Sequence, residues 1–263
     1  MIEFENQELN SALNTFIDRI LLILGEKVEM IVLYGSIAYE DVAPNYGDLD
    51  FHCLLNGNLT DKEIEELFEY RDKLKGSNNI YLKMLEGEFA PMSLCKENRY
   101  EKVAYWGTSR VKVVDQITVR TFSLMGLIKR GIVIFGKDLR SEYKVPTRQV
   151  MIDDVYHMIS VVRRHAQATN EGIHSIDWLF LISQSIYWVI NGDVTCKSKA
   201  AEWVYGQEFS NWINYLPKAI ELRRNPLLAD LPNNREWLKN LGPIIQGACN
   251  DLERLIMKKT NNE

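Results

Sequence analysis

The sequence predicts an α+β (mixed α/β) fold in two lobes, in which a lobe of helices and strands precedes an all-helical lobe. In the first part of the 263-residue chain, helix-like and strand-like segments alternate, which is typical of α/β packing. In the remainder, helical segments follow one another and are separated by glycine and proline. We place the boundary near Pro146, which divides the chain into residues 1–147 and 148–263.

The first lobe is predicted to open with a helix and a strand. Apolar residues within Leu9–Leu24 recur at helical spacing, and Gly25 stands where a glycine ends a helix. The short apolar run Val28–Tyr34 indicates a strand. Thr60 and Glu63 form a capping-box pattern that opens a charged helix. The remaining elements expected here are strands at Asp48–Leu55, Asn79–Phe89, Val111–Val114 and Gly131–Phe135, and helices reaching Lys75 and spanning Thr118–Lys129.

The second lobe is predicted to be a helical bundle. The expected helices are Val155–His165, Asp177–Ile190, Ser198–Tyr205, Trp212–Arg224 and Ile244–Lys258. The segment Asp177–Ile190 is apolar on nearly every side, which predicts a buried central helix. The basic cluster Arg163-Arg164-His165 is interpreted as a solvated helix face, with a phosphate contact as the alternative.

Charge and cysteine usage exclude several classes of protein. The net charge of −5 argues against a broad nucleic-acid or anionic-membrane surface. The four cysteines include no CxxC pair, so we expect reduced thiols and no zinc cluster. The N-terminus lacks the features of a signal peptide, and no apolar run approaches 18 residues. We therefore expect a cytoplasmic protein with no membrane partner.

Two carboxylates are predicted to share one face of a strand. Side chains alternate along a strand, so Asp48 and Asp50 project to the same side, away from Leu49. Two such carboxylates repel each other unless a cation joins them, and hard oxygen ligands suit Mg²⁺ that also shares phosphate oxygens. An isolated Asp-x-Asp is typical of a solvated turn. The interpretation therefore depends on the segment that precedes it.

That segment predicts a phosphate cradle. A strand that ends in Gly35-Ser36 and passes into a short turn exposes backbone N–H groups, and glycine lets the backbone approach a phosphate. Cradle and carboxylates together indicate a metal-bound nucleoside triphosphate. Glu86, on the next predicted strand, is the candidate general base. Glu88 lies on the same face and is its competitor.

Three segments resemble a known family. LYGSIAYEDVAPNYGDLDF, from Leu33 to Phe51, resembles the hallmark of the DNA polymerase β superfamily of nucleotidyltransferases. DWLFLISQSIYWVINGDVTCKSKAAEW, from Asp177 to Trp203, and GIVIFG, from Gly131, look like the streptomycin/spectinomycin adenylyltransferases. The resemblance covers most of the chain. It implies a polymerase-β-like lobe with a mixed sheet and a C-terminal helical lobe, which bind ATP and an antibiotic between them.

The resemblance also implies roles for individual residues. The metal-binding acids of the family fall on Asp48 and Asp50, and its catalytic glutamate falls on Glu86. A lysine that binds the triphosphate falls on Lys197, and Lys199 is near enough to compete for that assignment.

Contacts with the acceptor are implied for fewer residues. Trp106 lies in a segment that the family uses at its cleft, where it could stack on a substrate ring or be a core aromatic. Glu88 and Asp177 are the acidic candidates for binding the acceptor. An arginine of the family is replaced by Gln184, and the acids before that helix are matched only loosely, by Glu171, His174 and Asp177. The nucleotide chemistry is therefore carried over better than the identity of the acceptor.

The predicted function is Mg²⁺-dependent transfer of AMP from ATP to a hydroxyl of a small acceptor, with release of pyrophosphate. Two Mg²⁺ ions are expected, and the acceptor is expected to be an aminoglycoside or aminocyclitol antibiotic such as streptomycin or spectinomycin. One alternative is another acceptor, such as a protein, an RNA or another drug. A second alternative is a non-catalytic, nucleotide-binding regulatory protein. We expect no nucleic-acid partner, and a monomer or weak dimer.

Overall fold

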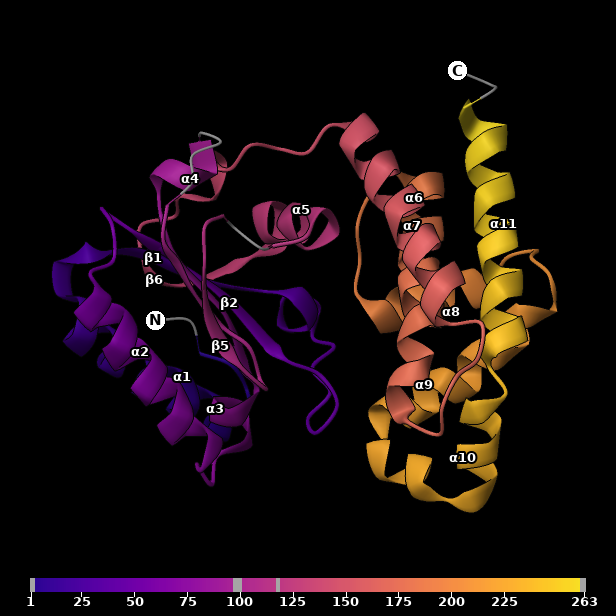
Figure 1. Cartoon of the computed structure of the whole chain (residues 1–263), viewed down its shortest axis with the longest axis horizontal. Helices are drawn as coiled ribbons and strands as arrows, with labels where there is room; N and C mark the ends of the chain where they lie inside the picture. The colour runs from indigo at the N-terminus through magenta and orange to yellow at the C-terminus, as the bar shows by residue number, and fades with distance from the viewer. Residues whose placement is uncertain (1–2, 97–100, 117–118, 261–263) are drawn as a thin grey trace. The chain divides into compact units, whose positions relative to one another are not determined.

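A computed structural model of the chain describes residues 3–96, 101–116 and 119–260. The contacts divide the chain into two compact units, Met1–Pro146 and Thr147–Glu263. Figure 1 shows the two units. The division falls one residue before the expected boundary between residues 147 and 148. The first unit contains helices and a mixed sheet, and the described part of the second contains helices and no strand, so the predicted α+β fold class is confirmed.

A mixed sheet forms the framework of the first unit. Within the described residues it has six strands in the order β5-β4-β3-β2-β1-β6. The strands are β1 (Val28–Tyr34), β2 (Leu49–Leu55), β3 (Leu85–Pro91), β4 (Val103–Trp106), β5 (Val111–Val114) and β6 (Ile132–Gly136). Strands β2 and β3 are parallel and the other neighbours are antiparallel. The parallel pair brings corresponding ends of two strands together at the same edge of the sheet.

The helices of this unit are α1 (Gln7–Leu24), α2 (Asp61–Lys75), α3 (Ile80–Met84), α4 (Ser93–Lys96) and α5 (Thr121–Arg130). Two of these helices have an end where a local signal predicts it: α1 ends before Gly25, and α2 begins after Thr60. Helix α1 is followed by Gly25 at φ 55°, and both halves of the capping box between Thr60 and Glu63 are present at α2. Strand β1 passes directly into a short 3-10 turn, η2 (Gly35–Tyr39), as expected for the Gly-Ser segment.

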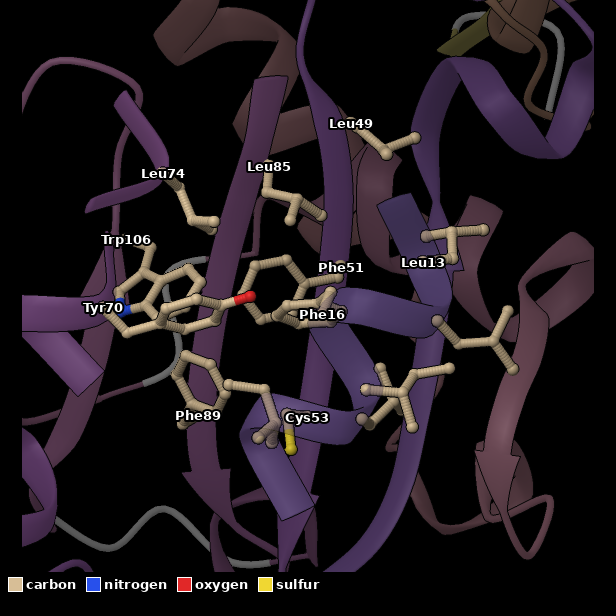
Figure 2. Packing of buried hydrophobic residues seen from close by; sticks show 14 of the residues in the cluster. Leu13, Phe16, Leu49, Phe51, Cys53, Tyr70, Leu74, Leu85, Phe89 and Trp106 are labelled. Carbon is tan, nitrogen blue, oxygen red and sulfur yellow. The ribbon is translucent and has the colours of Figure 1, made fainter. Parts of the chain in front are cut away.

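The two faces of the sheet have different environments. One face packs against α1 and α2 through an aromatic cluster in which Trp106 meets the rings of Phe16, Phe51, Tyr70 and Phe89 (Figure 2). Burial of this apolar surface stabilises the fold by about 25 cal/mol per Å². The opposite face carries a smaller cluster that includes a leucine of α5. The polar residues of β2 and β3 lie on this second face.

The predicted strand Asn79–Phe89 is wrong in its first half. The side chain of Asn79 accepts hydrogen bonds from the backbone N–H groups of Tyr81 and Leu82, which starts α3. The strand begins only at Leu85, where pairing with Leu49 of β2 begins. Strand β4 and helix α4 were not predicted from the sequence. Helix α5 begins at Thr121, and the expected start at Thr118 lies outside the described residues.

The second unit is a bundle around α7, as predicted. Its helices are α6 (Arg148–His165), α7 (Asp177–Asn191), α8 (Lys197–Tyr205), α9 (Leu216–Arg224), α10 (Pro232–Lys239) and α11 (Gly242–Thr260). Helix α7 packs against α6, α8 and α11. The expected helix Trp212–Arg224 is divided at Pro217, because proline occupies the first turn of α9 and the preceding residues form a 3-10 turn. Helix α10 was not predicted.

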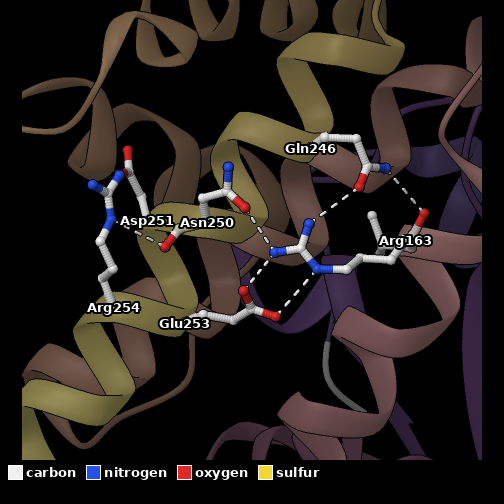
Figure 3. Close-up of polar contacts among 7 residues, drawn as sticks. Arg163, Gln246, Asn250, Asp251, Glu253 and Arg254 are labelled. Atoms are coloured by element: carbon white, nitrogen blue, oxygen red, sulfur yellow. Dashed lines mark hydrogen bonds and ion pairs between the residues drawn. The ribbon is translucent and has the colours of Figure 1, made fainter.

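One residue of the basic cluster at the end of α6, Arg163, has a packing role. The guanidinium of Arg163 donates to Glu253 at 3.2 Å, to Gln246 at 3.3 Å and to Asn250 at 2.8 Å, all on α11 (Figure 3). These bonds fasten α6 to α11. Arg163 therefore contributes to packing, whereas Arg164 and His165 are exposed, as expected for a solvated helix face.

The cysteines are all buried and none forms a disulfide, as expected. Among the described residues, no helix has both the length and the apolar character required to cross a bilayer.

Candidate functional site

Acidic residues meet on the second face of the sheet, where β2 and β3 begin. The parallel register pairs Asp50 with Glu86 and His52 with Glu88. Asp48 directly precedes β2 and is separated from Asp50 in the sequence by the fully buried Leu49. Strand alternation thus orients Asp50 and Glu86 to one face. Two residues that the sequence could place only on separate predicted strands are therefore direct neighbours.

Glu86 is held by two hydrogen bonds. The hydroxyl of Tyr105 donates to its Oε1 atom at 2.6 Å, and the backbone N–H of Thr108 donates to Oε2 at 3.1 Å. Glu86 is partly exposed, whereas Glu88 is only 1% exposed. A carboxylate has about four lone-pair sites, so these two bonds leave Glu86 able to accept a further proton or hydrogen bond. Of the two glutamates, Glu86 is the one that a solute can reach.

Two tyrosines border the acidic group and remain protonated. Burial, followed by the charges of Asp50 and Glu88, raises the pKa of Tyr34 well above its usual value. Burial, the hydrogen bond to Glu86 and the nearby carboxylates raise the pKa of Tyr105 likewise. Because the charges of Asp48 and Glu86 act on the same phenol, both carboxylates lie near Tyr105. Both tyrosines are therefore hydrogen-bond donors at neutral pH.

The turn after β1 lies beside Asp50. Gly35 has a φ of 68°, in the left-handed region that favours glycine. The backbone carbonyl of Ser36 accepts a hydrogen bond from Asp41 at 2.9 Å, and this bond helps to close η2. Gly35 and Ser36 are both partly exposed. The expected phosphate-cradle segment and the expected metal-binding acid are thus adjacent in space.

The carboxylates form an incomplete set of metal ligands. Over the described parts of the chain, no group of three or more His, Cys, Asp or Glu side chains could hold a metal ion. Asp48 and Asp50 nevertheless offer oxygen donors where β2 begins, and the Asp50 carboxylate occupies the space that a side chain at Gly35 would fill. This donor set suits Mg²⁺, which keeps several waters and is completed by substrate phosphates rather than by a full protein cage.

One residue near the acids was missed by the sequence analysis. Arg71 of α2 is fully buried, and the charges of Glu86 and Asp48 act on its guanidinium. A usable signal was present in the sequence. Arg71 lies four residues after Leu67 and three before Leu74, which places it on the apolar stripe of the helix.

In the second unit, the structure brings together two of the predicted residues. Lys197, the first residue of α8, forms an ion pair with Asp177 at 2.7 Å, and His174 lies 3.1 Å from the same carboxylate. Lys199 is exposed. The Gln184 side chain donates to the carbonyl of Thr195 at 2.7 Å and so fastens the segment before α8.

Trp106 does not belong to a substrate surface. It is fully buried in the aromatic cluster on the first face of the sheet, opposite the acidic residues. Alternation along β4 directs Tyr105 to the acidic face and Trp106 away from it. Of the two roles expected for Trp106, the structure has core packing and not stacking on a substrate ring, so Trp106 is not part of the proposed site.

Comparison with known proteins identifies the fold. No protein-family model matches the chain, and no curated protein matches its sequence. The chain is similar in structure to spectinomycin adenyltransferase AAD(9) from Enterococcus faecialis, solved with ATP and spectinomycin, with a TM-score of 0.65 and 16% identity. The match covers 93% of this chain and 99% of that chain. The expected resemblance to this group of adenylyltransferases is thus confirmed for the fold.

Proposed function

We propose that the chain is a nucleotidyltransferase that moves AMP from ATP to a hydroxyl of a small acceptor and releases pyrophosphate. The observation that carries the proposal is the register pair between Asp50 and Glu86, with Asp48 beside them. This pair joins candidate metal ligands to a candidate base in one place. The similarity in fold to an adenyltransferase solved with ATP supports the same reaction.

Each residue has a distinct part in the proposed mechanism. Asp48 and Asp50 would hold Mg²⁺, which when bound neutralises charge on the phosphates. The backbone at Gly35 and Ser36 offers N–H groups to the phosphates. Glu86 accepts the proton of the acceptor hydroxyl. At the same time the hydroxyl oxygen bonds to the α-phosphorus of ATP, and the bond between that phosphorus and the departing pyrophosphate breaks. Lys197 is proposed as a further phosphate ligand.

The proposed acceptor is an aminoglycoside or aminocyclitol. Such antibiotics carry several positive charges, and carboxylates at a binding site attract them. Asp177 is proposed to contribute such a charge, and its ion pair with the ammonium group of Lys197 at 2.7 Å supports this proposal. The spectinomycin in the similar structure supports this class of acceptor.

Pyrophosphate release tests the proposal directly. Purified protein would be incubated with Mg·ATP and, in turn, streptomycin, spectinomycin and kanamycin. We expect release that depends on one drug and on Mg²⁺, and none from Asp50→Asn, which should keep the wild-type melting temperature. Wild-type activity in Asp50→Asn would overturn the metal assignment.

A non-catalytic nucleotide-binding protein is the second candidate. It is favoured by Gln184, which stands where the family has an arginine and is engaged with the carbonyl of Thr195. Calorimetry with Mg·ATP separates the two candidates. Binding of ATP with no pyrophosphate release for any drug would favour the second, whereas release with one drug would exclude it.

A further inference from the structure

Arg71 makes an unusual set of contacts for a buried charge. It is fully buried on α2, and among the described residues its guanidinium donates to backbone carbonyls only: Nε to Gly107 at 3.2 Å, Nη1 to Leu82 at 3.4 Å and Nη2 to Lys83 at 2.9 Å. The planar fork of arginine can reach several acceptors at once in fixed directions. One side chain thus connects two separate segments of the chain.

Both segments lead directly to Glu86. Leu82 and Lys83 form the last turn of α3, whose carbonyls have no partner within the helix, and β3 with Glu86 follows immediately. Gly107 lies in the turn between β4 and β5, next to Thr108, whose N–H donates to Glu86. Arg71 therefore holds the start of the strand that carries Glu86 and also the turn that orients its carboxylate.

Burying the charge of Arg71 costs free energy, which indicates that Arg71 does more than fill space in the core. Burial lowers the pKa of Arg71, and the charges of Glu86, Asp48 and Asp72 act in the opposite direction. An apolar residue of similar volume would fill the same place on α2 without removing a charge from water. The opposing charges include two of the three candidate site acids, Glu86 and Asp48.

We propose that Arg71 is a positioning residue that holds Glu86 in place for nucleotidyl transfer by fixing the start of β3 and the β4–β5 turn together. The assignment of Glu86 as the base rests on the proposed function. The double anchor is a separate statement about the structure, and it has a test that needs no activity.

The kinetic test uses Arg71→Lys, which keeps the charge and loses the fork. We expect kcat to fall at least about tenfold while KM for ATP stays within about twofold, because misplacing a reacting group affects the chemical step. The same substitution would also be made in Glu86→Gln. There it should change the residual kcat by less than about twofold, since the base is already lost. An equal fall in both backgrounds would overturn the proposal.

The structural test is amide hydrogen exchange by NMR. In Arg71→Lys the Thr108 amide should exchange at least about tenfold faster than in the wild type, because its turn is no longer held against Glu86. The Asp41 amide, bonded to the Ser36 carbonyl at 2.9 Å, is the control and should change by less than about twofold. Unchanged exchange at Thr108 would overturn the anchor, whether or not the protein transfers AMP.

A second variant keeps the proposal testable if Arg71→Lys does not fold. A β-carbon at Gly107 would lie 2.8 Å from the carbonyl of Arg110 and 3.2 Å from Cε1 of Tyr105. Gly107→Ala therefore disturbs the anchored turn and leaves Arg71 in place. We expect the same fall in kcat and the same faster exchange at Thr108. Wild-type values for both would contradict the proposal.

Discussion

Gly35 and Asp50 occupy positions that depend on each other: a β-carbon at residue 35 would lie 2.1 Å from the Oδ2 atom of Asp50. Gly35 also has a φ of 68°, which side chains other than glycine rarely adopt. Two independent constraints thus require glycine here. One constraint is the left-handed backbone of the turn from β1 into η2. The other is the carboxylate of Asp50, a candidate metal ligand, which occupies the space where a β-carbon would lie.

Substitution of Gly35 separates these two constraints. We expect Gly35→Ala to lose activity at least about a hundredfold, because the methyl group displaces the Asp50 carboxylate. The matched control is Gly192→Ala, since Gly192 has a φ of 69° and open space around its α-carbon. Both variants should lose about 1–2 kcal/mol of stability in urea unfolding, from the left-handed backbone. Equal loss of activity in the two would contradict a specific effect on Asp50.

The two glutamates of β3 are predicted to differ in function. Glu86→Gln should lower kcat by roughly 10²–10⁴, the usual contribution of a general base. Glu88→Gln should change kcat by less than about threefold, because Glu88 is 1% exposed and does not reach a solute. Single-turnover rates with saturating Mg·ATP measure both effects. A larger loss in Glu88→Gln would exchange the two assignments.

The lysines of α8 are predicted to differ in ATP binding. Lys197→Met should raise KM for ATP about tenfold with a smaller effect on kcat, as expected when one ionic contact to phosphate is lost. Lys199→Met is the control, since Lys199 is exposed, and it should stay near the wild type. Asp177→Asn removes the carboxylate that competes for Lys197 at 2.7 Å, so ATP should bind at least as tightly as in the wild type. Calorimetric titration with ATP measures these affinities. If Lys199 is the phosphate ligand instead, Lys199→Met should weaken ATP binding more than Lys197→Met does.

The free energy of unfolding is predicted to depend on pH through the buried side chain of His52. Burial lowers its pKa to about 3, and its Nδ1 atom lies 3.0 Å from the hydroxyl of the buried Tyr143. The unfolded chain takes up a proton at His52 as the pH falls through about 6.5, and the folded chain does not. The free energy of unfolding should therefore decrease between pH 6.5 and 3, by up to about 1.4 kcal/mol per pH unit.

The measurement is urea unfolding of the wild type and of His52→Asn from pH 4.5 to 7. Asparagine keeps a polar group near the position of Nδ1 and does not titrate. The carboxylates titrate in both proteins, so the difference between the two curves isolates His52. Parallel curves would show that His52 does not carry this dependence.

Local signals predicted most of the fold. The apolar period of α1, the capping box of α2 and the strand Val28–Tyr34 are determined by neighbouring residues, and the structure has them as expected. The strand prediction was wrong for the first half of Asn79–Phe89, because an apolar run of this kind is compatible with helix and strand alike. There, Asn79 starts a helix, and pairing with β2 begins only at Leu85.

The candidate site was only partly predictable. Asp48, Asp50 and Glu86 were chosen for their chemistry and spacing, but the partners of Glu86 come from another strand and turn. Tyr105 and Thr108 have no motif of their own. Trp106 was ambiguous because a large aromatic residue suits both a substrate ring and a core, and only its neighbours in the fold place it in the core.

By itself, the sequence determined the order of the lobes, most helix and strand boundaries, and the acidic residues that are proposed to carry chemistry, because each depends on residues near in the chain. Only the tertiary structure decided that Asp50 lies beside Glu86, that Arg71 connects α3 with the β4–β5 turn, and that Trp106 is buried. These relationships join segments distant in sequence. They follow from the register of the sheet and the packing of helices on it, which no local pattern specifies.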